Sequence, residues 1–170
     1  RLRGGTAVAL AAAVSPAGGP ATAAPGEIVE QPAAGASYFA YVGCRTTRER
    51  DARGEGINVH RVDAASGRWE HVQLVPGLVN PSFLAFDRTK RFLYTVHGDS
   101  SEVSAFRVDP ATGRLASINR RSTGGKNPVH LAVDPTGRFL VVANHVTSTL
   151  AVLPVREDGS LGEVIDLVAL

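Results

Sequence analysis

Residues 80–93 read NPSFLAFDRTKRFL, and residues 127–140 read NPVHLAVDPTGRFL. Nine of these fourteen positions are identical, and over the longer stretches Asn80–Val108 and Asn127–Val155 eleven of 29 positions agree. A second pair of similar stretches, Arg61–Arg68 and Arg107–Arg114, lies 46 residues apart, against 47 for the first pair. Unrelated stretches do not agree at two nearly equal spacings. The sequence therefore predicts a structural repeat with a period near 47 residues.

Each repeat contains short runs rich in Val, Leu, Phe and Tyr that are separated by Asp-Gly, Thr-Gly and Ser-Gly turn signals. No helical periodicity competes with this pattern. The fold class is all-β, and four-stranded blades around a common axis are the expected architecture. A β-sandwich is the alternative, although its strands need not repeat in sequence. The expected strands are 84–87, 92–96, 103–108 and 115–122, followed by 129–134, 139–144, 149–155 and 162–169.

The first repeat supplies only three strands, at 38–43, 57–62 and 69–75, so its blade lacks an inner strand. A ring that is closed by a strand from the far terminus would show such a gap. Residues 38–170 hold about 2.8 repeats of this length, whereas closed propellers have four to eight blades. We expect residues 37–170 to form a partial β-propeller of about three blades. Further C-terminal blades, or other chains, are then needed to close the ring.

Residues 1–36 have a different composition, with 22 Ala, Gly or Pro residues. Arg1-Leu2-Arg3, the apolar stretch Thr6–Val14 and the small residues Ala21-Thr22-Ala23 fit an export signal with its cleavage site. The alternative is a disordered Ala/Pro linker, and in either case we expect this segment not to pack. The segment predicts a periplasmic or extracellular protein, with a cytoplasmic location as the alternative.

Composition excludes several classes of protein. Eighteen basic and sixteen acidic residues leave a net charge of +2, and without Arg1 and Arg3 the charges balance, so nothing points to nucleic acid as a partner. The single cysteine, Cys44, excludes an internal disulfide framework. No apolar run reaches the roughly 18–20 residues of a membrane span. The five histidines lack metal-ligand spacing, so neither a metal nor another cofactor is expected.

The order of motifs resembles a known family. The stretches NPSFLAFDRTKRFLYTVHGD, VSAFRVDPATGRL, STGGKNPVHLAVDPTGRFLVVANH and LAVLPVREDGSLGE are similar to the lactonase family of seven-bladed β-propellers, which includes the propeller-type 6-phosphogluconolactonases. Tyr41-Val42-Gly43 resembles the opening strand of that family. A weaker likeness to surface-layer propellers with YVTN repeats lies in LYTVHGDSSEVSAFRVD. The resemblance implies a hydrolase that acts on a small sugar-acid lactone such as 6-phosphogluconolactone. The alternative is an exported propeller that binds partners without catalysis.

The resemblance does not carry over the family's proposed His, Arg and Glu active-site set, because those motifs belong to later blades. Among the residues of this chain, His130 opens the first strand of its repeat, where it can face a central channel. A neutral imidazole there can act as general base toward a water that attacks a lactone, or donate a hydrogen bond to its carbonyl. The alternative is a packed histidine, since Phe83 holds the equivalent position. His130 is the candidate catalytic residue.

Three residues are candidates for substrate binding. Asn144 and its repeat equivalent His97 each end a second strand, where they can donate to a carboxylate or phosphate oxygen; a strand-end cap is the alternative role. Lys126 follows Gly124-Gly125 near the expected channel entrance and can meet an anionic substrate, or lie in a solvated loop. Aspartates that recur at the same place in the repeats, by contrast, are expected to form turns. They are Asp63, Asp87, Asp109 and Asp134.

Overall fold

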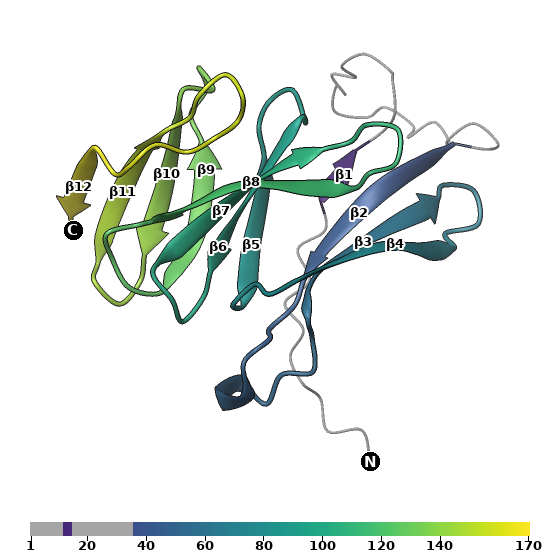
Figure 1. Ribbon diagram of the computed structural model, residues 1–170, viewed down its shortest axis with the longest axis horizontal. Helices are drawn as coiled ribbons and strands as arrows, with labels where there is room; N and C mark the ends of the chain where they lie inside the picture. The colour runs from purple at the N-terminus through teal and green to yellow at the C-terminus, as the bar shows by residue number, and fades with distance from the viewer. Residues whose placement is uncertain (1–11, 15–35) are drawn as a thin grey trace, which may run out of the picture.

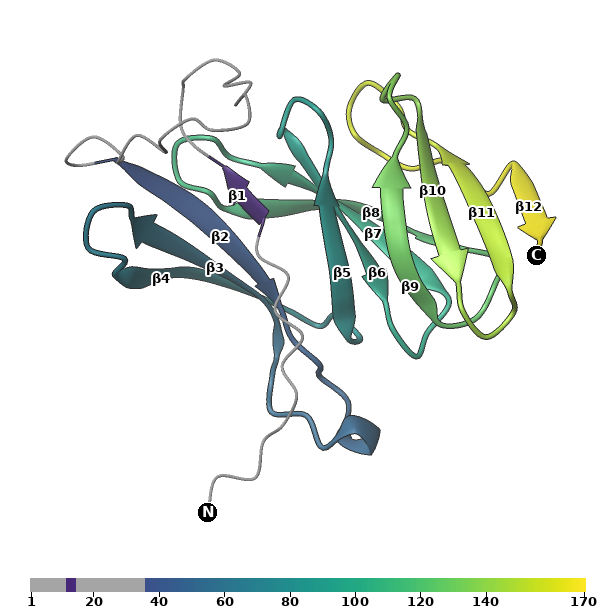
Figure 2. The ribbon, with the colours of Figure 1, turned by 180° about the vertical axis from the view of Figure 1, so that it is seen from behind.

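The computed structural model describes residues 12–14 and 36–170. Three four-stranded antiparallel sheets follow one another along the chain and spread like a fan (Figure 1). The sheets approach each other most closely at their inner strands, where β5 lies against β9, and β1 and β2 lie against β5. Figure 2 shows the same arrangement from behind. Four-stranded sheets that converge on one line form a partial β-propeller, so the predicted fold class is confirmed.

The second and third sheets are simple meanders. Each central strand is paired on both sides with its sequence neighbours, in the orders β5-β6-β7-β8 and β12-β11-β10-β9. Every predicted strand of these two repeats has a counterpart. The strands of the second sheet are β5 (Pro81–Phe86), β6 (Phe92–His97), β7 (Glu102–Val108) and β8 (Leu115–Ser122). Those of the third are β9 (Pro128–Val133), β10 (Phe139–Asn144), β11 (Thr149–Pro154) and β12 (Asp166–Ala169).

The last strand is shorter than expected, because β12 begins at Asp166 and not at residue 162. The preceding residues take other backbone partners. Leu161 forms an isolated bridge with Val155, and the N–H of Gly162 donates to the carbonyl of Pro154 at 2.8 Å. These bonds fold the segment back toward the end of β11 before pairing with β12 starts.

The first sheet takes three strands from the predicted repeat, namely β2 (Ser37–Gly43), β3 (Gly56–Asp63) and β4 (Trp69–Pro76), with a short 3-10 helix, η1 (Arg48–Arg50), between β2 and β3. The innermost strand of this sheet is β1 (Ala12–Val14), which pairs antiparallel with β2. In this pairing Val14 lies opposite Phe39, and Ala12 lies opposite Tyr41. The expectation that nothing before residue 37 packs is thus corrected for these three residues. The free edge of β2 offers unpaired N–H and C=O groups, which an extended segment satisfies. The rest of the predicted export signal lies outside the described residues.

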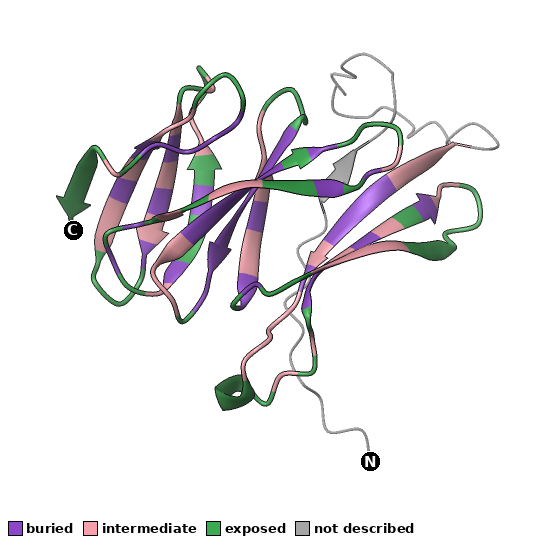
Figure 3. Cartoon of the chain, in the orientation of Figure 1, coloured by how far each residue is buried: buried purple, intermediate pink, exposed green. Residues whose placement is uncertain are grey.

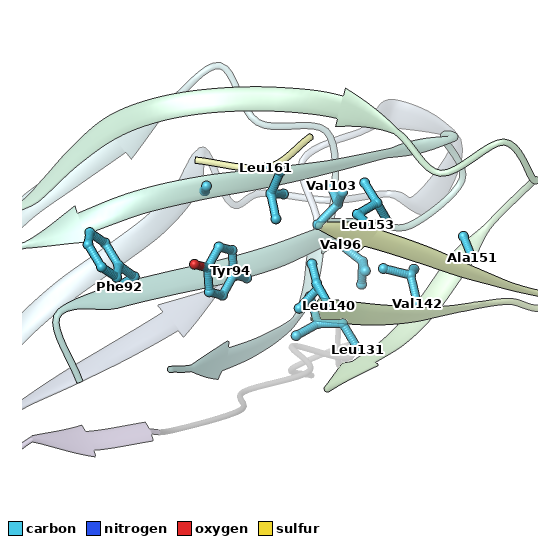
Figure 4. Packing of buried hydrophobic residues seen from close by; sticks show 11 residues of the cluster. Phe92, Tyr94, Val96, Val103, Leu131, Leu140, Val142, Ala151, Leu153 and Leu161 are labelled. Atoms are coloured by element: carbon cyan, nitrogen blue, oxygen red, sulfur yellow. The ribbon is translucent and has the colours of Figure 1, made fainter. Parts of the chain in front are cut away.

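The hydrophobic core consists of two layers between the sheets. We call the layer between the first and second sheets the first seam; it contains Phe39, Tyr41, Ile57, Val59 and Phe106. The second seam, between the second and third sheets, is shown in Figure 4. Buried residues run along the middle strands and exposure increases at the turns and at β12 (Figure 3). The second seam contains Phe92, Tyr94, Val96, Val103, Leu131, Leu140, Val142, Ala151, Leu153 and Leu161 among others.

Both seams use the same polar contacts. Tyr41 donates from its hydroxyl to the carbonyl of Gly113 at 2.7 Å, and Tyr94 donates in the same way to Gly159 at 3.1 Å. Burial raises the pKa of both phenols above their ordinary value, so they remain protonated donors. In each pair the tyrosine belongs to one sheet and the glycine to a turn of the next sheet. A buried hydroxyl with its partner thereby fixes how far one sheet slides on its neighbour.

A second contact of the seams comes from amide side chains on the outer strands. Gln73 on β4 accepts from the N–H of Leu115 at 2.7 Å and donates to its carbonyl at 3.0 Å. In the same way, Asn119 on β8 accepts from the N–H of Leu161 at 3.1 Å and donates to its carbonyl at 2.8 Å. Each amide therefore replaces the missing β partner of a residue in the next sheet.

The turn role that the sequence predicts for the recurring aspartates is confirmed. Asp134 accepts hydrogen bonds from the backbone N–H groups of Thr136, Arg138 and Phe139. Its carboxylate also accepts a hydrogen bond from the Thr136 hydroxyl, which makes the largest contribution to lowering its pKa. Together these donors lower the pKa of Asp134 to about 2. Asp87 binds Thr89 and Phe92 in the same pattern one repeat earlier. The carboxylates of Asp87 and Asp134 therefore accept hydrogen bonds from the backbone of the turns that they form.

Candidate functional site

The sheets have two ends with different loops. At one end, which we call the loop end, the connections between second and third strands meet the connections that lead into each inner strand (Figure 2). The opposite end is called the turn end. It carries the connections between the first and second strands of a sheet and those between the third and fourth strands. All four predicted site residues lie at or near the loop end. The connections of the loop end are residues 44–55, 77–80, 98–101, 123–127 and 145–148.

His130 lies on β9, the innermost strand of the third sheet, and pairs with Ala143 of β10. Its side chain is exposed. The imidazole packs on the ring of Phe83, the equivalent residue of β5, with ring centroids 4.1 Å apart and planes inclined at 45°. None of the described residues forms a hydrogen bond with its ring nitrogens. An accessible imidazole held by an aromatic ring can accept a proton from water or donate to a bound oxygen.

His97 lies in the interior and is 0% exposed. Its Nδ1 is 2.9 Å from the carbonyl of Val79, which requires an N–H there, and its Nε2 is 2.7 Å from the hydroxyl of Ser104. Burial lowers the pKa of His97, and the nearby charge of Arg120 lowers it further. The lowered pKa favours the neutral form of the imidazole, and both of its nitrogens have hydrogen-bond partners. In this geometry His97 fastens the 77–80 connection to the end of β6.

Asn144 holds the corresponding place in the third sheet and is 2% exposed. Its amide nitrogen donates to the carbonyl of Thr123 at 3.3 Å and to the hydroxyl of Thr149 at 3.2 Å. Its Oδ1 is buried and has no partner among the described residues. Gly125 packs against it so closely that a Cβ there would lie 2.4 Å from the Asn144 amide nitrogen. Asn144, like His97, holds the connection into an inner strand.

Lys126 is exposed in the 123–127 connection. Its backbone is fixed, because its N–H donates to the Thr147 hydroxyl at 3.1 Å and its carbonyl accepts from Val146 at 3.2 Å. The ammonium group makes no hydrogen bond or ion pair with any residue from 36 to 170. The structure therefore brings Lys126 and His130 to the accessible surface near the inner strand, while His97 and Asn144 lie beneath the same loops.

The structure adds a polar hub that sequence reasoning missed. Asp99 forms a two-point ion pair with Arg50 and accepts from the Asn80 amide at 3.0 Å, and Arg45 lies 3.8 Å away. The hydrogen bond from Arg50 is the main reason that the pKa of Asp99 is lowered. This hub ties the charged 44–55 loop to the second sheet. No sequence signal pointed to it, since the repeat equivalent of Asp99 is Val146.

The Asn-Pro pairs are the second part of this hub. Asn80 and Asn127 both have positive φ, 38° and 54°. The side-chain oxygen of Asn80 accepts from the N–H of Thr46 at 2.7 Å, and that of Asn127 accepts from the N–H of Asp99 at 2.9 Å. Each asparagine thus holds a loop of the preceding sheet. Both Asn-Pro pairs stand directly before or at the start of an inner strand, β5 or β9, and form the turn that leads into it.

The described part of the chain shows no group of three or more His, Cys, Asp or Glu residues placed to hold a metal ion. Within the same residues, no helix is long and apolar enough to cross a membrane. What the loop end does present is one accessible imidazole beside an aromatic ring, one ammonium group, and loops fixed by buried amides and an ion-pair hub. The set comprises one group that can exchange a proton and one that can contact an anion.

These features define a β-propeller with accessible polar groups on its inner strands. The chain belongs to the lactonase family of seven-bladed β-propellers, because the family model "Lactonase, 7-bladed beta-propeller" matches residues 39–170. A 6-phosphogluconolactonase of Formosa agariphila is 32% identical over 118 residues, which are 65% of this chain and 33% of that protein. A 6-phosphogluconolactonase of Bacillus subtilis is 30% identical over 126 residues, with coverages of 73% and 35%.

Solved structures give the same fold. A periplasmic gluconolactonase of Pseudomonas aeruginosa superposes with a TM-score of 0.70 at 32% identity, over 78% of this chain and 38% of that one. A putative 6-phosphogluconolactonase of Bacteroides fragilis superposes with a TM-score of 0.70 at 27% identity, with coverages of 78% and 36%. The chain spans about a third of the length of these relatives.

Proposed function

We propose that the protein hydrolyses a sugar-acid lactone such as 6-phosphogluconolactone. The observation that carries this proposal is the family match over residues 39–170, together with relatives named for lactone hydrolysis. A propeller that only binds partners is not favoured by these comparisons. In the reaction, water adds to the lactone carbonyl, the ring C–O bond breaks, and the product carries a carboxylate and a hydroxyl group.

His130 is the proposed general base or carbonyl donor. It is exposed on an inner strand, has free ring nitrogens among the described residues, and is held against Phe83. As a base it takes a proton from the attacking water, and it can return that proton to the departing ring oxygen. Donors aimed at the developing oxyanion would lower the barrier further.

Lys126 is the proposed contact for the anionic group of the substrate, because its ammonium is exposed at the same end of the sheets. For His97 and Asn144 the burial supports an indirect role: they hold the connections that carry the neighbouring binding surface. We further propose that additional blades complete the ring and supply the remaining catalytic groups. The family is named as seven-bladed and the structure describes three sheets.

Export is a separate proposal. It rests on the basic and apolar pattern of residues 1–23 and on the structural relative that is named as periplasmic. Removal of that signal would also remove β1 from the first sheet. An N-terminal sequence read from protein secreted into the periplasm or medium tests it: a start near residue 24 supports export, and an intact cytoplasmic protein opposes it.

The activity test measures proton release from 6-phosphogluconolactone and from gluconolactone at constant pH, with the spontaneous rate subtracted. The purified full-length protein, with all of its blades, should accelerate at least one of them. His130→Ala should lower kcat/KM by about 100-fold or more, the usual contribution of a general acid–base group. The matched control is His71→Ala, on the outer strand β4, which should leave the rate unchanged. Absence of acceleration with both lactones would contradict the lactonase proposal; equal rates for wild type and His130→Ala would contradict the role of His130.

A further inference from the structure

A cavity of about 480 Å³ lies at the turn end of the second seam, remote from the loop end of the same strands. Its walls come from the β5–β6 turn, the β9–β10 turn and the segment that follows β11. This volume falls within the range of small-molecule sites. The residues that line it are Asp87, Arg88, Thr89, Arg91, Phe92, Thr136, Gly137, Val155, Arg156 and Glu157.

Three guanidinium groups line this cavity, and each is anchored through one nitrogen. Arg88 donates from Nη1 across the seam to the carbonyl of Pro135 at 2.8 Å. Arg91 donates from Nε to the Thr89 hydroxyl at 3.2 Å and lies over the Phe92 ring. Arg156 donates from Nη1 to the carbonyl of Leu161 at 3.2 Å. The other two nitrogens of each group have no hydrogen-bond partner within residues 36–170.

No carboxylate neutralises these arginines at ion-pair distance among the described residues, whose ion pairs involve Arg45, Arg50, Arg120 and Arg121. The cavity wall does contain two carboxylates. That of Asp87 is engaged by the N–H groups of Thr89 and Phe92. Glu157 is exposed and is free to lower the positive potential of the cavity. The three arginines therefore face a space bordered by the carboxylates of Asp87 and Glu157, of which Asp87 is held by its own turn. Asp158 also lies close enough to Arg156 to interact with it electrostatically.

The comparison of repeats shows that two of these arginines are particular to this seam. The residue equivalent to Arg88 in the next repeat is Pro135, and the one equivalent to Arg156 in the previous repeat is Asp109. Asp109 forms its turn by accepting from the N–H of Ala111, a role that an arginine cannot take. Turn residues that the blade requires recur in each repeat. Arg88 and Arg156 depart from the repeat, and both departures add positive charge beside this one cavity.

We propose that this cavity is an anion site that takes the phosphate group of a small phosphorylated molecule. Guanidinium groups match the oxygens of phosphate with paired, charge-assisted hydrogen bonds. Three anchored groups offer more donors than the two oxygens of a carboxylate can accept, whereas a phosphate monoester presents three free oxygens. The three side chains are exposed, but one nitrogen of each is already hydrogen-bonded, which reduces the side-chain freedom that is lost on binding. The volume of about 480 Å³ leaves room for a carbon skeleton beside the phosphate.

The test is a calorimetric titration of the purified protein with inorganic phosphate at constant ionic strength, with acetate in a parallel experiment. Saturable binding of phosphate is expected, and weaker binding of acetate. Arg88→Ala and Arg156→Ala should each weaken phosphate binding at least tenfold. Glu157→Gln should strengthen it, because it removes the competing charge. Arg88→Ala should thus weaken phosphate binding and Glu157→Gln should strengthen it. General damage to the turn would weaken binding in both variants, so the opposite effects identify a charge effect.

Arg138→Ala is the matched control for Arg91→Ala. Arg138 donates to the Thr136 hydroxyl at 3.3 Å and lies over Phe139, as Arg91 does with Thr89 and Phe92, but it does not line the cavity. Arg91→Ala should weaken binding and Arg138→Ala should not. No saturable binding, equal losses in both variants, or acetate binding as tightly as phosphate would each overturn the proposal. The variants at positions 88, 91 and 156 assign the binding to the turn end, and they leave Lys126 and His130 at the loop end unchanged. Their outcome is therefore independent of the test of lactone hydrolysis.

Discussion

At the scale of single residues, His97 and Asn144 show how one place in a repeat can be filled by different chemistry. Both are buried at the end of a second strand, and both bond to the connection that leads into the inner strand. His97 has a partner for each of its ring nitrogens, whereas the buried Oδ1 of Asn144 has none in the part of the chain that the structure describes. An unpaired buried oxygen costs free energy. The third sheet therefore tolerates a weaker fastening of its loop than the second sheet.

His97 makes the stability of the protein depend on pH. The folded state lowers its pKa by burial, whereas in the unfolded chain the pKa is about 6.5. Below that value the unfolded state binds more protons than the folded state. The free energy of unfolding should therefore fall as the pH falls from about 6.5 toward the folded pKa, with a slope of at most about 1.4 kcal/mol per pH unit. Urea unfolding at a series of pH values measures it.

His97→Asn, which copies the residue of the third sheet, is the control for this slope. The variant should be less stable at neutral pH but should lose less stability on acidification. His60, whose pKa is also lowered by burial, is present in both proteins and cancels in the comparison. If wild type and variant have parallel pH profiles, His97 does not titrate as this structure requires.

At the scale of elements, the turns before the outer strands serve the seams as well as their own sheets. Gly113 and Gly159 have positive φ, 71° and 85°. A Cβ at Gly159 would lie 2.2 Å from the ring of Phe92, and one at Gly113 would lie 2.3 Å from the ring of Phe39. Each glycine thus lets the aromatic ring of the preceding sheet lie directly on the turn. Both turn geometry and packing between sheets require glycine there.

Gly159→Ala should therefore destabilise the protein more than Gly137→Ala. Gly137 also has positive φ, 75°, but a Cβ there would have no heavy atom within 4 Å. Gly137→Ala should cost about 1–2 kcal/mol from backbone strain alone. Gly159→Ala should cost about 1–3 kcal/mol more, because the methyl group overpacks the seam. Chemical denaturation of both variants measures the difference in their free energies of unfolding. Equal destabilisation would show that the second seam accommodates the extra methyl group without an energetic penalty.

At the scale of the whole molecule, the two seams are separate layers that share only the second sheet. Repeat proteins behave approximately as a sum of units and interfaces between neighbours. Tyr41 serves the first seam and Tyr94 the second, each through one buried hydrogen bond. The seams should therefore respond to mutation independently, although they lie on opposite faces of one sheet.

Tyr41→Phe and Tyr94→Phe test that independence. Each should cost about 1–3 kcal/mol, because a buried glycine carbonyl loses its donor. In the double variant the losses should add to within about 0.5 kcal/mol. Thermal and denaturant unfolding of the four proteins give the coupling free energy. A coupling well above that figure would mean that the second sheet transmits strain from one seam to the other.

The separation of the two ends also matters for function. The proposed lactonase groups lie at the loop end, and the proposed phosphate cavity lies at the turn end of the second seam. The strands of the second and third sheets connect them through a packed core. The two proposed sites share none of their residues.

Much of the fold can be predicted from short stretches of sequence, because each blade repeats the same pattern of strands and turn residues. The alternation of apolar runs with turn residues gave the strand positions, and Asp87 and Asp134 form the turns that their spacing predicts. The placement of His130 on an inner strand also followed from the repeat. Each of these features depends on residues within one blade, whose backbone preferences and alternation do not need the rest of the molecule.

The remaining features depend on contacts between segments that are distant in the chain. Whether His97 faces a ligand or the carbonyl of Val79, and whether Asp99 is free or bound by Arg50, is decided when separate loops meet. The pairing of β1 with β2 likewise depends on an open strand edge. Repeat spacing alone determined the blades and their turns, since these arise from short-range geometry. Only the tertiary structure decided which polar groups are buried and which remain available, because burial depends on the packing of neighbouring sheets.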